Sequence, residues 1–333
     1  MNDSAPVPPL PTALQIEVTG SCNLSCRMCL VAYRPRLGRS ARLTLASLRT
    51  LLDDVPTVRE VTLQGLGEPL LVPDLEAMVA EVSSRGIRVG INTNGTLLTA
   101  ERSRALIAAG LDWLHVSIDG ACEETFAEIR VGGHLHTVLG NLRELLRARS
   151  IAGGTLPRVQ MNTVVMRRNA SELVALVDLA ADVGVDRLWI QGLSHDFSDV
   201  ATDSTFVAIR GWTEGQLVPD RLLETLLDRA ALRARERGLA LRLPDAVEAP
   251  AARGADEPGC DWPWRSAYVG FDGTVQPCCM LMGHDRGVLG NIHEQPLSSI
   301  WHSDAYGTLR QRLSSDDDPP DICAGCALYR GRF

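Results

Sequence analysis

Six short apolar runs alternate with longer amphipathic stretches along the N-terminal part of the sequence, and this alternation constrains the fold most. The apolar runs are rich in β-branched residues and lie at 14–19, 60–65, 87–92, 113–118, 158–165 and 187–192. The stretches between them repeat apolar residues with a helical period, at 43–54, 74–84, 100–109, 138–149 and 170–183. Strands joined by crossover helices run parallel with right-handed connections. The pattern therefore predicts an α/β fold, a partial (βα)6 barrel of parallel strands that binds ligands at the C-terminal strand ends.

The pattern changes after Gly192. Residues 194–215 are loop-like, residues 221–237 indicate an Arg-rich helix, and residues 244–259 have the composition of a linker. From Cys260 onward the chain has short strands and several cysteines. We predict an N-terminal extension at 1–13, the barrel at 14–215, a helix and linker at 216–259, and a small C-terminal Fe-S domain at 260–333.

Charge and composition exclude several function classes. The formal charge is -8 and no dense basic stripe interrupts the chain, so nucleic acid is not an expected partner. The sequence has neither an export signal nor an apolar run of roughly 18 residues, so we expect a soluble, cytoplasmic protein without a membrane partner. All 33 basic residues are Arg. The absence of lysine excludes a lysine Schiff base, including pyridoxal phosphate held in that way.

Three cysteines follow the first predicted strand. Cys22, Cys26 and Cys29 form a C-x3-C-x2-C pattern. Three thiolates this close together can bind one face of a cubane iron–sulfur cluster and leave one iron without a protein ligand. An open iron can bind a small chelating molecule. The alternative is a structural zinc site, which needs four ligands, and no histidine lies nearby to supply the fourth.

These motifs resemble those of the radical S-adenosylmethionine (radical SAM) enzymes. TGSCNLSCRMC is followed by LQGLGEP, INTNGTL and VSIDG at the ends of successive predicted strands, and the similarity covers about residues 14–193. In that family the open iron of a 4Fe-4S cluster chelates S-adenosylmethionine, and the reduced cluster cleaves it to a 5′-deoxyadenosyl radical. The resemblance thus implies an enzyme whose radical abstracts a hydrogen atom from its substrate.

The resemblance also implies which residues contact the methionine part of S-adenosylmethionine. Gln64, Gly65, Gly67 and Glu68 match the segment where backbone and carboxylate meet the methionine ammonium group. This chain has Gly-Leu-Gly-Glu where the family has Gly-Gly-Glu, and the glutamate is in place. The alternative for Glu68 is a turn or helix-cap carboxylate.

Further positions match the family's contacts to the rest of the cofactor. Ser117 and Asp119 match the strand end that contacts the ribose, and Met28 matches the residue that flanks the adenine. Asn94 and Arg130 lie in segments similar to the family's TNG and IR motifs. The alternatives are a capping role for Asp119 and simple packing for Met28.

A second group of cysteines lies near the C-terminal end of the sequence. Cys260, Cys278, Cys323 and Cys326 would be brought together by a short β-hairpin and a C-x2-C knuckle, which suits either an Fe-S cluster or a zinc ribbon. The surrounding segments WPWRSAYVGFDGTVQPCC, LGNI, SIW and CAGC resemble the twitch and SPASM domains of radical SAM enzymes. This resemblance implies one auxiliary 4Fe-4S cluster, in addition to the one that binds S-adenosylmethionine. A non-catalytic zinc-ribbon protein is the competing hypothesis.

Two cysteines and one segment complete the candidate site. Cys279 adjoins a predicted ligand, so its thiol is a candidate hydrogen-atom donor; it could instead be a packing residue or replace Cys278 as ligand. Cys122 is interpreted as an inert loop residue. Candidate substrate residues follow the sixth predicted strand: His195, Asp196, Arg210, Trp212 and Glu214.

These features favour a radical SAM enzyme acting on a small polar metabolite, such as an aminosugar, cyclitol or nucleoside. Only 21 residues precede Cys22, which leaves no room for a leader-binding domain before it and makes peptide modification the less favoured reading. Cys279 favours epimerisation, and natural-product biosynthesis, such as that of an antibiotic, is the expected setting. The alternatives are alcohol dehydrogenation that depends on the auxiliary cluster, and redox-neutral decarboxylation of a sugar acid or nucleoside such as a cytosylglucuronate. An external one-electron donor of the flavodoxin or ferredoxin type is expected.

Overall fold

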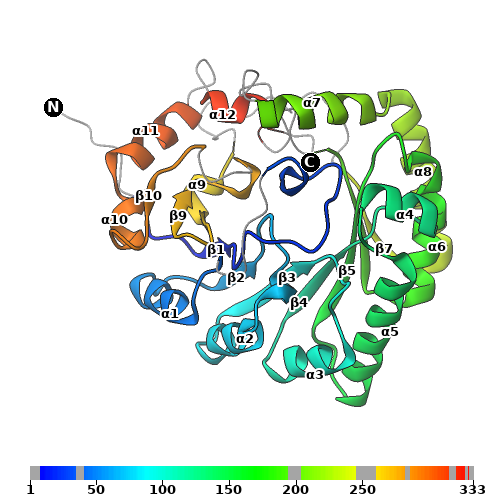
Figure 1. Ribbon diagram of the computed structural model, residues 1–333, viewed down its shortest axis with the longest axis horizontal. Coiled ribbons are helices and arrows are strands. Elements are labelled where there is room, and N and C mark those ends of the chain that lie inside the picture. The colour runs from blue at the N-terminus through cyan, green and yellow to red at the C-terminus, as the bar shows by residue number, and fades with distance from the viewer. Residues whose placement is uncertain are drawn as a thin grey trace.

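One curved sheet organises the molecule (Figure 1). The computed structural model describes residues 8–34, 41–193, 204–244, 260–281, 286–314, 320–326 and 329. Within these residues ten strands lie in the order β10-β9-β8-β1-β2-β3-β4-β5-β6-β7. Their bounds are β1 Ala13–Ile16, β2 Glu60–Leu63, β3 Arg88–Thr93, β4 Trp113–Ser117, β5 Arg158–Val164, β6 Arg187–Gln191, β7 Ala240–Arg242, β8 Ser266–Val269, β9 Thr274–Gln276 and β10 Gly290–Asn291. All neighbours from β8 through β1 to β7 are parallel, and β9 and β10 continue the sheet antiparallel.

Helices cover the outside of this sheet. The barrel helices are α1 Leu45–Asp54, α2 Leu75–Ser84, α3 Ala100–Ala108, α4 Glu123–Ile129, α5 Leu135–Ile151, α6 Leu173–Val183, α7 Ser204–Gln216 and α8 Asp220–Arg237. The C-terminal helices are α9 Trp262–Arg265, α10 Leu297–Trp301, α11 Asp304–Leu313 and α12 Asp321–Ala324, and short 3-10 turns lie at η1 Leu30–Ala32, η2 Pro69–Leu71, η3 Ala170–Glu172 and η5 Cys279–Leu281. Figure 1 shows α1, α2, α3, α5, α6 and α8 around the outer face, with α7 across the top.

Strand alternation separates the core from the interior of the barrel. Successive side chains of a strand point to opposite faces. One set is buried against the helices: Leu14, Ile16, Val61, Leu63, Val89, Ile91, Leu114, Val116, Val159, Met161, Leu188 and Ile190. The other set is mostly polar and lines a cavity, so the sequence alternates because each strand has an apolar outer face and a polar inner one.

The structure confirms the six predicted strands, the five predicted barrel helices and the helix at 221–237. The loop predicted at 194–215 is wrong over its second half, because α7 begins at Ser204. Phe206 and Ile209 recur at helical spacing and are buried with Leu30 of η1, which stabilises a helix despite two glycines. His195 and Asp196 lie outside the described residues.

The sheet also extends beyond the predicted six strands. β7 pairs with β6 inside the segment interpreted as helix and linker, and β8 of the C-terminal region pairs with β1. β7 has three residues and β8 has four, which is too few to show a reliable alternation of apolar and polar side chains. The proposed boundaries of the C-terminal domain stay a prediction.

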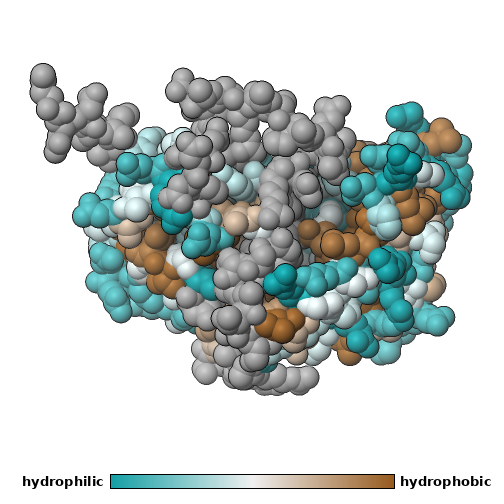
Figure 2. Space-filling model, turned by 90° about the horizontal axis from the view of Figure 1, so that it is seen from above, coloured by the Kyte–Doolittle hydropathy of each residue, from teal (hydrophilic) through white to brown (hydrophobic). Residues whose placement is uncertain are grey.

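The described surface is mixed in character. Seen from above, its hydrophobic side chains form separate patches among hydrophilic ones (Figure 2). Among the described residues, the helices are too short or too polar to cross a membrane.

Candidate active site

The first three cysteines lie in the loop that follows β1, at the C-terminal edge of the parallel strands. Cys26 is buried, and Cys22 and Cys29 are half-buried. The backbone N–H of Cys29 donates to the Cys26 carbonyl at 3.0 Å, and that of Leu24 donates to Cys22 Sγ at 3.4 Å. Burial raises the pKa of the Cys22 thiol to about 11 and that of Cys29 to about 12, and neighbouring thiols contribute in the same direction. Metal binding to these thiols would therefore release protons.

Two side chains from later parts of the chain reach the cysteine loop: Asn94 directly follows β3, and Arg130 directly follows α4. Asn94 Nδ2 lies 3.9 Å from Cys22 Sγ, and Arg130 Nη1 lies 3.9 Å from Cys26 Sγ. Arg130 is 8% exposed, and its Nη2 lies 2.6 Å from Oδ2 of the fully buried Asp119. A buried guanidinium thus lies beside one predicted cluster ligand, and its own charge is balanced by a carboxylate.

Glu68 is held by the protein's own donors. It is 2% exposed; Oε1 accepts from Leu70 N at 3.0 Å and Thr93 Oγ1 at 2.6 Å, and Oε2 accepts from Asn94 N at 2.7 Å. Burial raises the pKa of this carboxyl group, and the hydrogen bonds oppose that shift. Glu68 therefore caps η2, which was the alternative interpretation, and its contact with the methionine ammonium stays a prediction.

The two glycines before Glu68 are required by close packing. A Cβ on Gly65 would lie 2.1 Å from Glu17 Cγ, and one on Gly67 would lie 1.9 Å from the Thr19 carbonyl oxygen. Glu17 is 1% exposed, and its Oε1 accepts from Leu66 N at 2.7 Å and Gly67 N at 3.3 Å. The carboxylate at the end of β1 thus holds the Gly-Leu-Gly turn in place.

The remaining predicted cofactor contacts lie around the same edge. Ser117 ends β4 and is half-buried, as are Met28 and Gln64. Both oxygens of Asp119 are engaged, because Oδ1 accepts from Val164 N at 2.8 Å and Oδ2 pairs with Arg130. The ribose and adenine contacts of these residues stay predictions.

The C-terminal cysteines separate into two environments. Cys260, Cys278, Cys323 and Cys326 line one narrow cavity, with apolar walls that include Leu309 and Leu313. Cys279 does not line that cavity; it lines the large cavity inside the barrel. Burial raises the pKa of the Cys279 thiol to about 12, so it is protonated at neutral pH.

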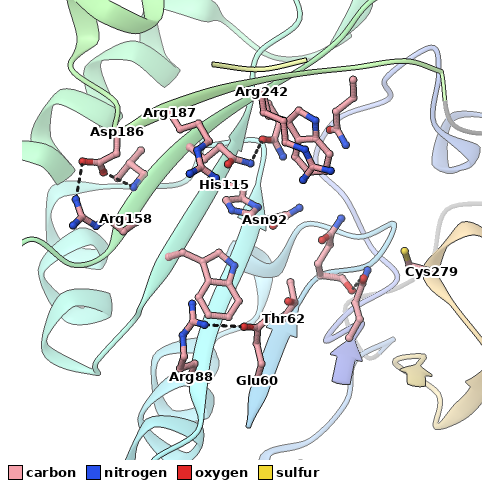
Figure 3. A pocket seen from close by; sticks show the side chains of 18 of the residues that line it. Glu60, Thr62, Arg88, Asn92, His115, Arg158, Asp186, Arg187, Arg242 and Cys279 are labelled. Atoms are coloured by element: carbon pink, nitrogen blue, oxygen red, sulfur yellow. Dashed lines mark hydrogen bonds and ion pairs between the residues drawn. The ribbon is translucent and has the colours of Figure 1, made fainter. Parts of the chain in front are cut away.

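A cavity of about 840 Å³ occupies the barrel interior. Figure 3 shows side chains from several strands pointing into it, with Cys279 at one side. Its polar lining residues are Gln15, Glu60, Thr62, Gln64, Arg88, Asn92, His115, Arg158, Gln160, Asn162, Asp186, Arg187, Gln191, Arg242 and Arg265. A cavity with this lining suits a polar ligand.

The two sets of cysteines fit the cofactors that the sequence implies. Four thiols around one cavity can supply all protein ligands of a 4Fe-4S cluster, and three thiols after β1 leave one position for a further ligand. Cysteine thiolate is the usual protein ligand of iron–sulfur clusters. The donor sets therefore suit one cluster with an open iron and one that is fully ligated by protein.

Sequence reasoning missed the residues of the barrel interior. Asn92, His115 and Arg187 line the cavity, and all three lie within the predicted strands. Strand alternation could have found them. Each lies an even number of residues from another polar residue of its strand, so both side chains point into the barrel.

Three predicted substrate residues are placed differently from expectation. Arg210, Trp212 and Glu214 belong to α7, where Arg210 Nε pairs with Glu214 Oε1 at 2.8 Å. They do not line the barrel cavity. Cys122 is exposed at the start of α4, and its Sγ lies 3.4 Å from Thr125 Oγ1.

Comparisons with known proteins identify the family. Family models match the radical SAM superfamily over residues 16–180 and SPASM, an iron–sulfur cluster-binding domain, over residues 260–327. The cofactor-modifying protein of tungsten-containing aldehyde ferredoxin oxidoreductase from Pyrococcus furiosus is 27% identical, over 95% of this chain and 87% of its own. The PqqA peptide cyclase of Streptomyces rochei is 28% identical, over 88% and 76%. The structure of Streptococcus suis SuiB bound to S-adenosylmethionine superposes with a TM-score of 0.70 at 19% identity, over 96% and 72% of the two chains. The chain belongs to the radical SAM superfamily and carries a SPASM-type iron–sulfur domain.

Proposed function

We propose that this radical SAM enzyme epimerises a small polar metabolite, such as an aminosugar, cyclitol or nucleoside, with Cys279 as the hydrogen donor. Its two domains imply S-adenosylmethionine, the 4Fe-4S cluster that binds it, and an auxiliary cluster as cofactors. Cys22, Cys26 and Cys29 would hold the first cluster. Cys260, Cys278, Cys323 and Cys326 would hold the second.

The orientation of Cys279 carries the proposal. Cys278 lines the four-cysteine cavity, whereas Cys279 lines the barrel cavity and lies at one side of it in Figure 3. A thiol in that place lines the barrel cavity and not the four-cysteine cavity, so it faces the space where a substrate would bind. Burial raises the pKa of this thiol, which favours the S–H form that hydrogen-atom donation requires.

The chain's own chemistry then consists of one hydrogen transfer. When bound, the cluster and S-adenosylmethionine supply a 5′-deoxyadenosyl radical that removes a hydrogen atom from a substrate C–H bond. The Cys279 S–H bond breaks, and its hydrogen atom goes to the substrate carbon from the opposite face. The resulting thiyl radical needs one electron and one proton, which we assign to an external flavodoxin-type or ferredoxin-type donor and to solvent.

The test is a deuterium experiment on the reconstituted enzyme. Candidate aminosugars, cyclitols and nucleosides are incubated with S-adenosylmethionine and reductant in deuterated water, and products are examined by mass spectrometry. Because the thiol exchanges with solvent, wild type should place one deuterium in the product. Cys279→Ala should still form substrate-dependent 5′-deoxyadenosine but no epimer. Cys122→Ala, which alters an exposed thiol, is the matched control and should behave as wild type.

The same experiment separates the other reactions. Full product from Cys279→Ala would overturn the epimerisation. A product that has lost two hydrogen atoms would indicate alcohol dehydrogenation with the auxiliary cluster as electron acceptor, and loss of carbon dioxide would indicate decarboxylation. Turnover only with a peptide would indicate peptide modification, the activity that the name of the Streptomyces rochei relative states.

A further inference from the structure

The barrel cavity has more arginines than carboxylates. Arg88, Arg158, Arg187, Arg242 and Arg265 line it, against Glu60 and Asp186. Both carboxylates are engaged: Glu60 pairs with Arg88 at 3.2 Å, and Asp186 pairs with Arg149 at 2.5 Å and Arg158 at 3.6 Å. Arg265 pairs with Asp261 outside the cavity lining at 2.8 Å.

Arg187 and Arg242 are the cavity arginines that remain without a carboxylate partner within the described part of the chain. They lie on the adjacent strands β6 and β7, where Arg187 is paired in register with Ala240 and Trp189 with Arg242. The Arg242 guanidinium lies 4.0 Å from the centre of the Trp189 ring, which fixes its direction. Two guanidinium groups thus share one wall of the cavity.

Neutral hydrogen-bonding groups lie in the same row as Arg187. The strand register places Asn92, His115, Gln160 and Arg187 side by side across β3, β4, β5 and β6. Asn92 Oδ1 is buried and has no hydrogen-bond partner in the described residues. Figure 3 shows Asn92, His115 and Arg187 converging on the cavity. An orphaned acceptor beside a cationic wall indicates a ligand that has both hydroxyl or amino donors and a negative charge.

The arginine wall lies outside the residues that the two family models match. Arg187 and Arg242 fall between residues 180 and 260, which neither model covers.

We propose that Arg187 and Arg242 form a subsite for an anionic group of the substrate, a carboxylate or a phosphate, while Asn92 and His115 bind its hydroxyl or amino groups. The inference rests on the proposed function and names its substrate class: an acidic, hydroxylated small molecule. The two arginines would bind the anionic group of the substrate, and the reacting carbon of the substrate would lie toward Cys279.

Anaerobic calorimetry on the reconstituted full-length enzyme tests the subsite. The probes are D-glucuronate, inorganic phosphate and the neutral methyl glucoside. We expect at least one anion to bind about tenfold more tightly than the glucoside, and Arg187→Gln or Arg242→Gln to remove that advantage. Arg210→Gln, which removes an arginine that is paired with Glu214 and does not line the cavity, is the matched control and should change anion affinity less than about twofold. Circular dichroism and iron content verify that each variant is folded.

The outcomes separate the subsite from the reaction. Preference for glucuronate assigns a carboxylate, and preference for phosphate assigns a phosphate. Equal binding of anions and glucoside, or equal losses in Arg210→Gln and Arg187→Gln, would overturn the subsite. Cys279→Ala should bind the anion as wild type does, so a failure of the epimerisation leaves this measurement intact.

Discussion

His115 couples the charge of the cavity to the stability of the fold. Burial, with the Arg187 guanidinium nearby, lowers its pKa from 6.5 to about 4. The unfolded chain therefore binds a proton at higher pH than the folded chain does. Between pH 6.5 and about 4 the unfolded state gains protons first, so falling pH reduces the free energy of unfolding.

Replacing His115 should remove this acid sensitivity. We expect wild type to lose about 2 kcal/mol through this group between pH 7.5 and pH 5, and His115→Gln to lack that part of the loss. Urea unfolding at both pH values measures it. His293→Gln removes a surface imidazole and keeps His115, so it should lose stability as wild type does. Parallel losses in wild type and His115→Gln would contradict the assignment.

The direction in which a side chain points could not be predicted for two adjacent cysteines. The sequence shows that Cys278 and Cys279 are adjacent but not which of them faces the other thiols. In the structure Cys278 lines the four-cysteine cavity, and Cys279, where η5 begins, lines the barrel cavity. The roles of Glu17 and Asn92 likewise depend on which loop or strand lies opposite.

At the level of elements, α7 packs on η1, the short 3-10 turn that directly follows the first group of cysteines. Ile209 is fully buried with Phe206 against Leu30, and Leu30 follows Cys29 directly. This cluster is small and separate from the main core, so truncation should loosen it locally more than it destabilises the whole fold.

Ile209→Ala should expose the first cluster. Removal of the buried side chain costs on the order of 2 kcal/mol and should increase the rate of iron loss from this site about tenfold or more. Anaerobic transfer of iron to a chelator measures that rate. Val207→Ala alters a side chain of the same helix that is 47% exposed and should leave the rate unchanged. Equal rates in both variants would show that α7 does not protect the cluster.

Helices and strands whose sequences show a strong hydrophobic period could be predicted. Helices and strands that form because of tertiary contacts could not. β1 to β6 and α8 have a clear alternation or amphipathic pattern over their own residues. α7 contains Gly211 and Gly215 and forms because it packs on η1, while β7 is three residues long and forms because β6 offers a free edge. The polar barrel interior follows from the same alternation, but its unpaired arginines require the register of five strands.

At the scale of the whole molecule, the SPASM-type region is part of the barrel's sheet. β8 runs parallel to β1 along four residue pairs, so the two cysteine groups are connected through adjacent strands. Asp54 at the end of α1 accepts from Ser298 N at 2.8 Å and Ser298 Oγ at 2.7 Å. These contacts place Cys279 beside the barrel interior, and they predict that both regions unfold as one cooperative unit.

Replacing Trp301 tests whether the barrel and the C-terminal region unfold together. Its ring is fully buried in the core that includes the barrel strands, it packs on Tyr306 at 4.8 Å between ring centres, and its Nε1 donates to the Pro9 carbonyl at 2.8 Å. Trp301→Ala should lower the free energy of unfolding by about 3–5 kcal/mol. Because the sheet is continuous, helix content and cluster absorbance should be lost together at a lower urea concentration. His302→Ala, which alters the exposed neighbour, should shift the midpoint far less. Early loss of one signal with the other unchanged would show instead that the C-terminal region unfolds independently of the barrel.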